Sequence, residues 1–426
     1  MHYDVVIVGG GAGGLELAAQ LGRKLGKREG REHILLVDAM PFHIWKPTLH
    51  EVAAGTLDAH QEGLSYTVLA RRNGFSFAMG KFTGLNAERK TVTLQAQHNE
   101  RGDEVVPERT ISYQKLVLAM GSGSNSFGTP GIENAYLLES VRDAQRFHAD
   151  WLSACAHASY AEPRSLAVAI VGAGATGVEL SAELLEAHTM LLESLSSSQR
   201  FRLDISLIEG GERILGGLPP RISEQATVAL ERKGVRVLTN TRVQALQRGT
   251  VITPAGSLPA DLIVWAAGIK AADANAQLGL AVNRINQFEV DDHLRTSAAN
   301  IYAMGDCAAT PWMDGKTVPA RAQAAHQQGT YLCKVLHAYL REGHFDAAFD
   351  YKDFGSLVSL GDNKGVGNLM GGLSGKNFFV QGLLAKWMYM SLHLMHHRAI
   401  LGSGKTAVLA LARLLQQRVS GRMKLH

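Results

Sequence analysis

The stretch YDVVIVGGGAGGLELA at residues 3–18 decides the fold of this chain, and LAVAIVGAGATGVELSAEL at residues 166–184 repeats its pattern. In each stretch an apolar run rich in β-branched residues precedes a Gly-x-Gly-x-x-Gly motif. Such an apolar run indicates a buried parallel strand. A helical pattern follows the motif. Each stretch therefore predicts the strand, tight turn and helix of a dinucleotide-binding unit.

The three glycines of each motif have separate physical roles. The first permits the tight turn, the second lets the backbone approach a pyrophosphate, and the third lets the helix pack close to the strand. The helix N-terminus then presents free N–H groups and its positive dipole end to the phosphates. These positions are Gly9, Gly11 and Gly14 in the first motif and Gly172, Gly174 and Gly177 in the second.

An acidic residue follows each motif at the end of a second apolar strand. Asp38 ends the run HILLVD, and Glu209 ends the run ISLIE. A carboxylate here accepts hydrogen bonds from a ribose 2′-OH and repels a 2′-phosphate, so Glu209 favours NADH over NADPH. Arg213, four residues later, weakens that preference. Ordinary glycine-rich turns are the alternative, but strand, motif, helix and acid all occur twice, which indicates an enzyme that transfers electrons between two dinucleotides.

The composition is that of a globular protein with two or three domains. Of the 426 residues, 46% are hydrophobic and 19% are charged, which allows a sizeable core. Cys155, Cys307 and Cys333 have no Cys-x-x-Cys spacing, so we expect neither a disulfide framework nor a metal site. A core strand begins almost at Met1, so we expect no signal peptide and a bacterial protein in, or facing, the cytosol.

Charge is unevenly distributed along the chain. Residues 1–362 hold 34 Lys or Arg against 39 Asp or Glu, whereas residues 363–426 hold nine basic residues and no acidic one. An acidic body with a basic tail predicts an anionic surface as partner, which we expect to be a lipid membrane and not a nucleic acid.

The sequence of the tail at 378–426 predicts two amphipathic helices that are separated at residues 402–404. The first has an apolar face of Leu383, Leu384, Trp387, Met388, Met390, Leu394 and Met395, and a polar face of Lys386, Tyr389, His393, His396 and His397. The second sets Val408, Leu411, Leu414 and Leu415 against Lys405, Thr406, Arg413, Gln416 and Gln417. Neither has the roughly 20 apolar residues of a spanning helix. We expect both to lie in the membrane surface, and the alternatives are that they cover the protein's own core or a dimer interface.

The predicted fold class is α/β, with two Rossmann-like domains of three ββα layers, the second inserted in the first. Residues 1–120 and 291–345 are expected to form the FAD-binding domain, and residues 121–290 the NADH-binding domain. Residues 346–426 are expected to form a C-terminal domain, with a short sheet at 346–375 followed by the membrane-associating helices.

This order resembles the two-dinucleotide flavoproteins, in which a Met-Gly-Asp segment like residues 304–306 contacts the flavin. Disulfide reductases of that superfamily carry a Cys-x-x-x-x-Cys pair after the first acidic strand. The corresponding stretch here, FHIWKPTLHEVAAGTLD at residues 42–58, has no cysteine. The flavin is therefore expected to pass its electrons to a diffusible acceptor.

The same stretch is similar to type II NADH:quinone oxidoreductase, the single-subunit alternative NADH dehydrogenase of bacteria. Further similar segments are residues 172–184, VWAAGI at 264–269, 303–307, PARAQAAHQQ at 319–328, YKDFGSLVSL at 351–360 and RMKLH at 422–426. The resemblance covers essentially the whole chain. It implies a respiratory-chain enzyme on the cytoplasmic face of the inner membrane. Such an enzyme binds FAD non-covalently, oxidises NADH and reduces a membrane quinone such as ubiquinone or menaquinone, without pumping protons.

The resemblance also assigns residues to each ligand. For FAD it implies Gly9, Gly11, Gly14, Asp38, Phe82 through its backbone, Asp306 and Ala325. For NADH it implies Gly172, Gly174, Gly177, Glu209 and Gly268. Lys46 and Pro47 would lie near the isoalloxazine ring, and Gln323 and Gln327 would bind the quinone. A homodimer formed through the C-terminal part is a further expectation of the family.

Gln323 and Gln327 are four residues apart, so both amides share one helical face and can hydrogen-bond a quinone carbonyl. A partly exposed polar helix face is the alternative. His326 is expected to be a neighbour of this face and not a proton donor.

Glu179 follows the third glycine of the second motif by two residues. A carboxylate in the first turn of a helix is stabilised by the helix dipole, which is a purely structural explanation. In the family a Glu at this position lies near the flavin, on the path of quinone protonation. Quinone reduction needs two protons, and a carboxyl group beside a partly dry site can relay them. We therefore expect Glu179 to be catalytic and Glu183, one turn later, to be structural.

Two other functions remain as alternatives. A sulfide:quinone oxidoreductase would share the flavin domain and tail but needs a cysteine pair beside the flavin, and Cys155 and Cys333 do not stand at recognisable positions. A flavoprotein redox sensor, whose NADH-reduced state recruits a partner, would be reoxidised only slowly by any quinone.

Overall fold

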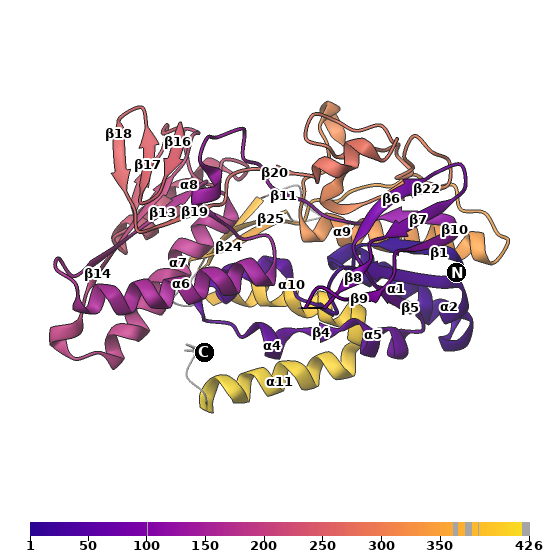
Figure 1. The fold of residues 1–426 in the computed structure, drawn as a ribbon, viewed down its shortest axis with the longest axis horizontal. Helices are drawn as coiled ribbons and strands as arrows, with labels where there is room; N and C mark the ends of the chain where they lie inside the picture. The colour runs from indigo at the N-terminus through magenta and orange to yellow at the C-terminus, as the bar shows by residue number, and fades with distance from the viewer. Residues whose placement is uncertain (100, 361–364, 371–376, 382, 420–426) are drawn as a thin grey trace.

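Two parallel sheets form the body of the molecule, and each contains one glycine motif (Figure 1). The computed structural model describes residues 1–99, 101–360, 365–370, 377–381 and 383–419. The mixed α/β architecture confirms the predicted fold class.

The first sheet lies on the right in Figure 1 and begins with the first motif. Its strand order is β5-β2-β1-β10-β7-β6, and β22 pairs with β10. Strands β5, β2, β1, β10 and β22 are parallel, whereas β7 is antiparallel to both β10 and β6. The bounds are β1 (His2–Val8), β2 (Ile34–Asp38), β5 (Ser76–Met79), β6 (Phe82–Asn86), β7 (Thr91–Leu94), β10 (Arg109–Leu118) and β22 (Ile301–Ala303).

The helix that follows the first motif packs against several other helices. Helix α1 (Ala12–Leu25) packs against α9 (Ala322–Leu340), α2 (Lys27–His33) and α5 (Tyr66–Asn73). Short elements complete the unit: β3 (Phe42–His43), η1 (Lys46–Thr48), α3 (Leu49–Ala54), α4 (Ala59–Glu62), β4 (Leu64–Ser65), β8 (Gln97–His98), β9 (Glu104–Val106), β21 (Phe288–Glu289) and β23 (Ala308–Ala309). The continuous apolar run of β1 is fully buried at Val5, Val6 and Ile7, as expected for a parallel strand that is covered on both faces.

The second sheet has the order β12-β19-β13-β14-β15 and is parallel throughout. A separate antiparallel sheet, β16-β17-β18, packs as its third layer at the upper left of Figure 1. The bounds are β12 (Tyr136–Leu137), α6 (Val141–Tyr160), β13 (Ser165–Val171), α7 (Ala175–Ser194), β14 (Arg202–Ile208), α8 (Pro220–Arg232), β15 (Arg236–Leu238), β16 (Ala245–Gln247), β17 (Thr250–Thr253), β18 (Gly256–Pro259) and β19 (Leu262–Trp265).

The chain passes between the two sheets twice, and the two crossings pair with each other. Strand β11 (Gly123–Ser124) leaves the first sheet and pairs antiparallel with β20 (Ile269–Lys270), which returns from the second. After the return, β22 completes the first sheet beside β10. The second unit is therefore inserted in the first, as predicted.

The C-terminal segment adds an antiparallel sheet of β24 (Gly355–Ser359), β25 (Gly365–Met370) and β26 (Asn377–Gln381). Helix α10 (Leu383–Leu401) follows and packs against α1, α5 and this sheet. Helix α11 (Ser403–Val419) lies along the lower edge of the molecule in Figure 1. The predicted break at 402–404 falls at Gly402, which has φ +82°. The predicted helix start at 378 is wrong, because residues 377–381 pair with β25.

Among the described residues, no helix combines the length and apolar character that crossing a bilayer requires. The predicted face of α10 is wrong where its side chains are described. His393, His396 and His397 are buried, whereas Met395 is 51% exposed. The side chains of residues 383–390, and those of Arg413, Leu414, Gln416 and Gln417, lie outside the described residues.

Candidate active site

The first glycine motif is closed on one side and open on the other. A Cβ atom on Gly9, which has φ +106°, would lie 2.3 Å from the Ala119 carbonyl oxygen, and one on Gly14 would lie 2.0 Å from the Gly9 carbonyl oxygen. A Cβ on Gly11 would meet no atom within 4 Å. The backbone is thus packed tightly against its own sheet and open beside Gly11, where a pyrophosphate can approach the start of α1. These residues fit the ADP half of FAD.

Asp38 is tied to this motif by backbone hydrogen bonds. Its Oδ2 accepts from the Gly10 N–H at 2.7 Å and its Oδ1 from the Met40 N–H at 2.8 Å. Burial raises the pKa of Asp38, against the lowering effect of these hydrogen bonds. A carboxylate has about four lone-pair sites, so it can still accept from a ribose hydroxyl. The Gly80 N–H donates to the Asp38 carbonyl at 2.8 Å, which places Phe82, at the start of β6, close to the same edge.

The second motif repeats this arrangement. A Cβ on Gly177 would lie 2.0 Å from the Gly172 carbonyl oxygen, whereas a Cβ on Gly174 would meet nothing within 4 Å. The Glu209 carboxylate accepts from the Ala173 N–H at 2.9 Å and from the Gly211 N–H at 2.8 Å. The two acids therefore hold the two motifs by equivalent bonds.

Arg213 and Gly268 lie near the second motif. The Arg213 guanidinium donates to the carbonyls of Gly216 and Leu218, so it is held within its own turn. Gly268 follows β19 with φ +62°, and a Cβ there would lie 2.5 Å from the Phe127 ring. Gly268 thus lies at the carboxyl end of the sheet, on the same edge as the motif.

Lys46 and Asp306 both contact Ser122, a residue that was not predicted from the sequence. The Lys46 ammonium donates to the Ser122 carbonyl at 2.6 Å, and the Ser122 hydroxyl donates to Asp306 Oδ2 at 3.0 Å. Ser122 follows the carboxyl end of β10, where ligands of open α/β sheets bind, and that position could have drawn attention to it. Ala325 lies nearby at the start of α9, where its Cβ is 3.2 Å from the position of a Cβ on Gly13.

Gln323 and Gln327 share one face of α9, as predicted, but their amides bind residues 352–355 of the same chain. Gln323 donates to Asp353 Oδ1 at 3.1 Å and to the Gly355 carbonyl at 2.9 Å, and accepts from the Phe354 N–H at 3.2 Å. Gln327 exchanges two hydrogen bonds with the Lys352 backbone, at 2.8 and 3.0 Å. Both side chains thus hold residues 352–355 against α9.

Glu179 is buried where the two units meet. It is 6% exposed, and its Oε1 accepts from the Ser359 N–H of β24 at 3.1 Å. Its Oε2 lies 3.6 Å from Nδ1 of His50 in α3. Burial raises the pKa of Glu179 to about 8, and the charges of Glu51 and Glu183 add to that rise. Glu179 is therefore largely protonated at neutral pH.

His50 links Glu179 to the segment that contains Lys46. Burial lowers the pKa of His50 to about 4, against a hydrogen bond with the Pro47 backbone, so the imidazole is neutral. Its Nε2 is buried and has no hydrogen-bond partner among the described residues. His50 and Ser359 were not found from the sequence, because their partner is more than a hundred residues away along the chain. Glu183 accepts from the Thr56 hydroxyl at 2.9 Å, which agrees with a structural role.

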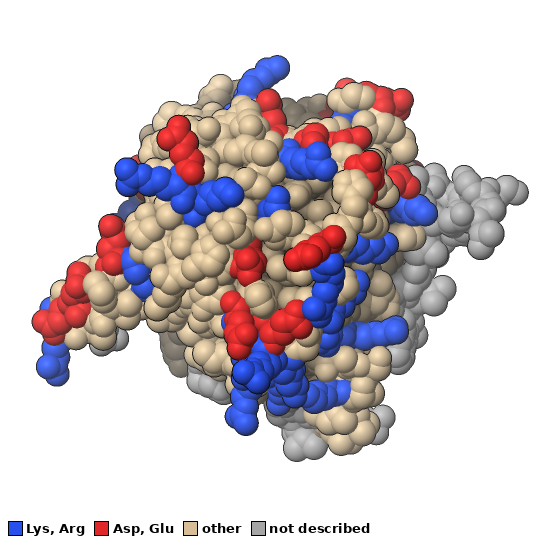
Figure 2. Space-filling view, turned by 90° about the vertical axis from the view of Figure 1, so that its right-hand side faces the viewer, with Lys and Arg blue, Asp and Glu red and all other residues tan. Residues whose placement is uncertain are grey.

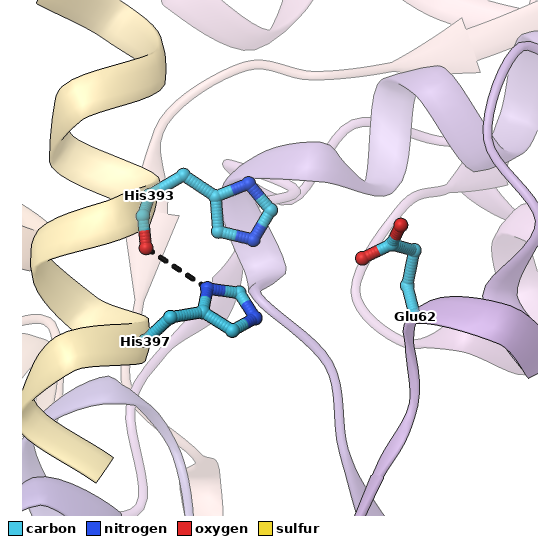
Figure 3. A group of neighbouring side chains, drawn as sticks. All are labelled: Glu62, His393 and His397. Atoms are coloured by element: carbon cyan, nitrogen blue, oxygen red, sulfur yellow. Dashed lines mark hydrogen bonds between the residues drawn. The ribbon is translucent and has the colours of Figure 1, made fainter. Parts of the chain in front are cut away.

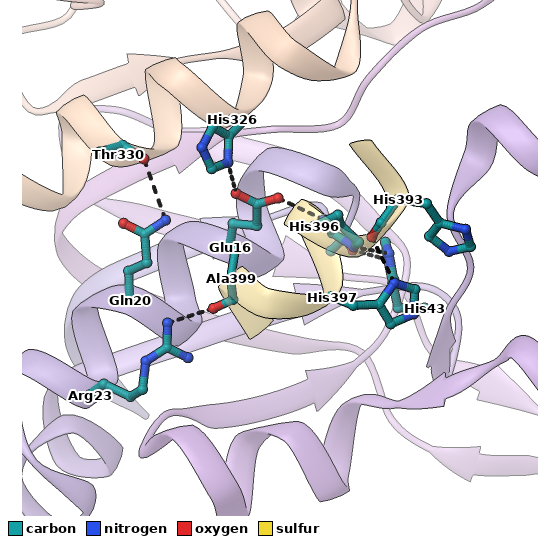
Figure 4. A network of polar contacts seen from close by, with 11 residues as sticks. Glu16, Gln20, Arg23, His43, His326, Thr330, His393, His396, His397 and Ala399 are labelled. Carbon is teal, nitrogen blue, oxygen red and sulfur yellow. Dashed lines mark hydrogen bonds and ion pairs between the residues drawn. The ribbon is translucent and has the colours of Figure 1, made fainter. Parts of the chain in front are cut away.

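A buried polar network joins α10 to the first motif (Figure 4). The Glu16 carboxylate, 1% exposed, binds His326 of α9 through one oxygen and Nδ1 of His396 at 2.7 Å through the other. His396 Nε2 lies 2.8 Å from His43 Nε2, and the other nitrogen of His43 bonds the Gly10 carbonyl at 2.9 Å. His326 is therefore a partner of Glu16.

The three cysteines are free, buried and in different elements, α6, η5 (Gly305–Cys307) and α9. Burial raises the pKa of Cys155 to about 12 and that of Cys307 to about 11, and it also raises that of Cys333. Thiols that stay protonated are poor nucleophiles. These positions disfavour the sulfide:quinone alternative.

The chain is similar to known proteins over its whole length. The family model of pyridine nucleotide-disulphide oxidoreductases matches residues 3–329. The type II NADH:quinone oxidoreductase of Haemophilus influenzae is 40% identical over 99% of this chain and 100% of its own length. That of Staphylococcus aureus is 27% identical over 86% of this chain and 90% of its own.

Among solved structures, NDH2 from Plasmodium falciparum in complex with NADH has a TM-score of 0.82 at 19% identity and covers 99% of both chains. At that identity the match shows the fold alone. The family rests on the model match and on the Haemophilus relative. The chain therefore belongs to the pyridine nucleotide-disulphide oxidoreductases and, within them, to the type II NADH:quinone oxidoreductases, flavin-dependent enzymes that oxidise NADH and reduce a quinone without pumping protons.

Proposed function

We propose that residues 1–120 and 291–345 hold FAD, that residues 121–290 receive NADH, and that the quinone is reduced where Glu179 meets the segment of Lys46 and Pro47. The observation that carries this assignment is the contact between Glu179 and His50. Helix α7 begins at the second motif, so its first turn joins the proposed NADH unit to the proposed flavin unit.

In this proposal, different sets of residues bind FAD and NADH. Gly9, Gly11, Gly14, Asp38 and the Phe82 backbone hold the ADP half of FAD, and Asp306 and Ala325 hold its flavin end. Gly172, Gly174, Gly177, Glu209 and Gly268 bind NADH. When bound, FAD supplies the hydride acceptor for NADH and the two-electron donor for the quinone.

Glu179 acts in this proposal as the proton donor to the reduced quinone. Its carboxyl group keeps its proton up to about pH 8 and lies in a buried site with a neutral imidazole beside it. A general acid works best when its pKa lies near the operating pH. Gln323 and Gln327 shape the quinone entrance by holding residues 352–355, and a direct bond to the quinone would require one of their present bonds to break.

We further propose that α11 binds the cytoplasmic face of the bacterial inner membrane. Val408, Leu411 and Leu415 are 70%, 57% and 58% exposed on this helix. Such spacing places apolar side chains on one side of a helix. Lys405, at its start, is exposed as well. A basic helix with an exposed apolar face is typical of interfacial membrane binding.

The surface near α11 is also basic. The exposed Arg71 and Arg72 lie in the last turn of α5. Asn73, which ends that helix, donates to the Ile400 carbonyl at 3.0 Å, close in sequence to Arg398 in the last turn of α10. Figure 2 shows Lys and Arg gathered toward the lower part of this end of the molecule. A second copy of the chain is the alternative occupant of the apolar face.

The proposal is tested with the FAD-loaded enzyme and a short-chain quinone. NADH should bleach the flavin absorbance, NADPH should do so far more slowly, and quinone should restore the absorbance within the turnover time. Slow recovery with every quinone would favour the redox sensor instead.

A further inference from the structure

Three potential metal ligands meet where α10 passes α4. His393 and His397 are one turn apart on α10, and Glu62 is the last residue of α4. One ligand atom from each residue lies within 4.8 Å of the other two. In Figure 3 the Glu62 carboxylate points toward the two imidazole rings. The proposed reaction centre does not use these three side chains, although His393 contacts Trp45, which precedes Lys46 in the chain.

The histidine pair is prepared for binding a cation. The His397 Nδ1 donates to the His393 carbonyl at 2.9 Å, so its Nε2 carries the free lone pair. The ring of His393 is stacked on Trp45, with ring centres 6.0 Å apart and an interplanar angle of 9°. The hydrogen bond sets the tautomer of His397, as outer contacts do for metal-binding histidines, and the stacking orients the ring of His393. Both rings are buried, with exposed fractions of 8% for His393 and 3% for His397.

We propose that Glu62, His393 and His397 form a site for a divalent d-block cation of the Zn²⁺ class. Two imidazoles and one carboxylate are a common ligand set for Zn²⁺, with water in the fourth position. Glu62 is partly exposed, so the cation and this water have access from solvent. With metal–ligand bonds of about 2.0 Å, tetrahedral ligands lie about 3.3 Å apart, so small side-chain rotations from the present spacing close the site.

The bound cation would link α10 to α4, which follows α3 in the chain. On its other side α10 is held to α1 by the bond between His396 and Glu16. A metal that binds only the folded chain stabilises it in proportion to its concentration and affinity. The site therefore joins the C-terminal helices to the first unit.

The test uses the tag-free, FAD-loaded full chain after treatment with a chelator. Zn²⁺ is titrated in competition with a chromophoric chelator, and Co²⁺ absorption reports the coordination geometry. We expect one Zn²⁺ per chain, tetrahedral Co²⁺ bands, and a melting temperature that rises with Zn²⁺. Glu62→Gln and His397→Ala should each weaken Zn²⁺ binding at least tenfold. His344→Ala is the control, because His344 is exposed and outside the cluster.

Absence of Zn²⁺ binding by the native chain would overturn the proposal, and so would Glu62→Gln with unchanged affinity. Glu62→Gln keeps the size of a partly exposed side chain, so it reports on the site even where His397→Ala fails to fold. Melting in the absence of metal verifies that each variant is folded.

Discussion

Oε2 of Glu179 lies 3.6 Å from Nδ1 of His50, and both side chains are buried. The two residues come from different units, α7 of the second and α3 of the first. Both are largely uncharged at neutral pH, because burial raises the pKa of the acid to about 8 and lowers that of the base to about 4. The contact thus places a proton-carrying group between the proposed binding sites for the two dinucleotides.

Glu179 should make the stability of the fold depend on pH. The unfolded chain releases this proton near pH 4.5 and the folded chain near pH 8, so between these values the folded state binds more protons. The free energy of unfolding should therefore fall as pH rises through this window. Glu179→Gln should flatten that fall and be more stable than the native chain above pH 8. Glu193→Gln, an exposed change at the end of the same helix, should leave the slope unchanged.

Glu209→Ala should weaken NADH binding. The substitution removes the proposed ribose contact and the two hydrogen bonds that hold the Ala173 and Gly211 N–H groups. Hydrogen bonds to charged groups are worth about 1.5–3 kcal/mol, so KM for NADH should rise about tenfold or more. Discrimination against NADPH should also decrease. Glu212→Ala, at an exposed neighbour, is the control, and an unchanged KM in Glu209→Ala would refute the assignment.

Two alanine substitutions in the first motif should fail in different ways. Gly14→Ala forces a Cβ within 2.0 Å of the Gly9 carbonyl oxygen, so the fold itself should be disrupted. Gly11→Ala meets no atom within 4 Å and should fold, but its methyl group enters the proposed space for the pyrophosphate. Melting of the FAD-free chain and the ratio of FAD to protein separate these effects. Full FAD occupancy in Gly11→Ala would contradict the proposed site.

Membrane binding should depend on the exposed apolar residues of α11. Changing Val408, Leu411 and Leu415 together to Ser should abolish flotation with anionic vesicles while NADH oxidation with a soluble quinone persists. Val105→Ser and Val228→Ser, at exposed positions elsewhere, are the controls. If the triple variant still floats but loses self-association, the face is a dimer interface. Deleting residues 380–426 is a poorer test, because it also removes His396 from buried Glu16.

The sequence predicts those parts of the structure whose signal is local. Each motif, its strand and its acidic partner lie within about 40 residues, and the open side at Gly11 and Gly174 follows from the glycine pattern alone. Ser122, His50 and Ser359 were missed because each is an ordinary polar residue until its distant partner is known. Their importance comes from the way the two units pack.

The histidines of α10 show how tertiary contacts override a periodic pattern. Helical periodicity placed His393, His396 and His397 on a polar, outward face. The structure buries them, because Glu16 and His43 supply polar partners for His396, and Trp45 stacks on His393. The four-residue spacing of His393 and His397 was visible in the sequence, but Glu62 joins them only through the fold.

The central claim is that Glu179 serves the quinone and not NADH, and stopped-flow measurement of the two half-reactions tests it directly. In Glu179→Gln, flavin reduction by NADH should stay within about twofold of the native rate. Reoxidation by quinone should slow by about 10²-fold or more, the usual contribution of a general acid, and should lose its dependence on a group with a pKa of about 8. An unchanged rate of reoxidation, or an equal loss in both half-reactions, would contradict the claim.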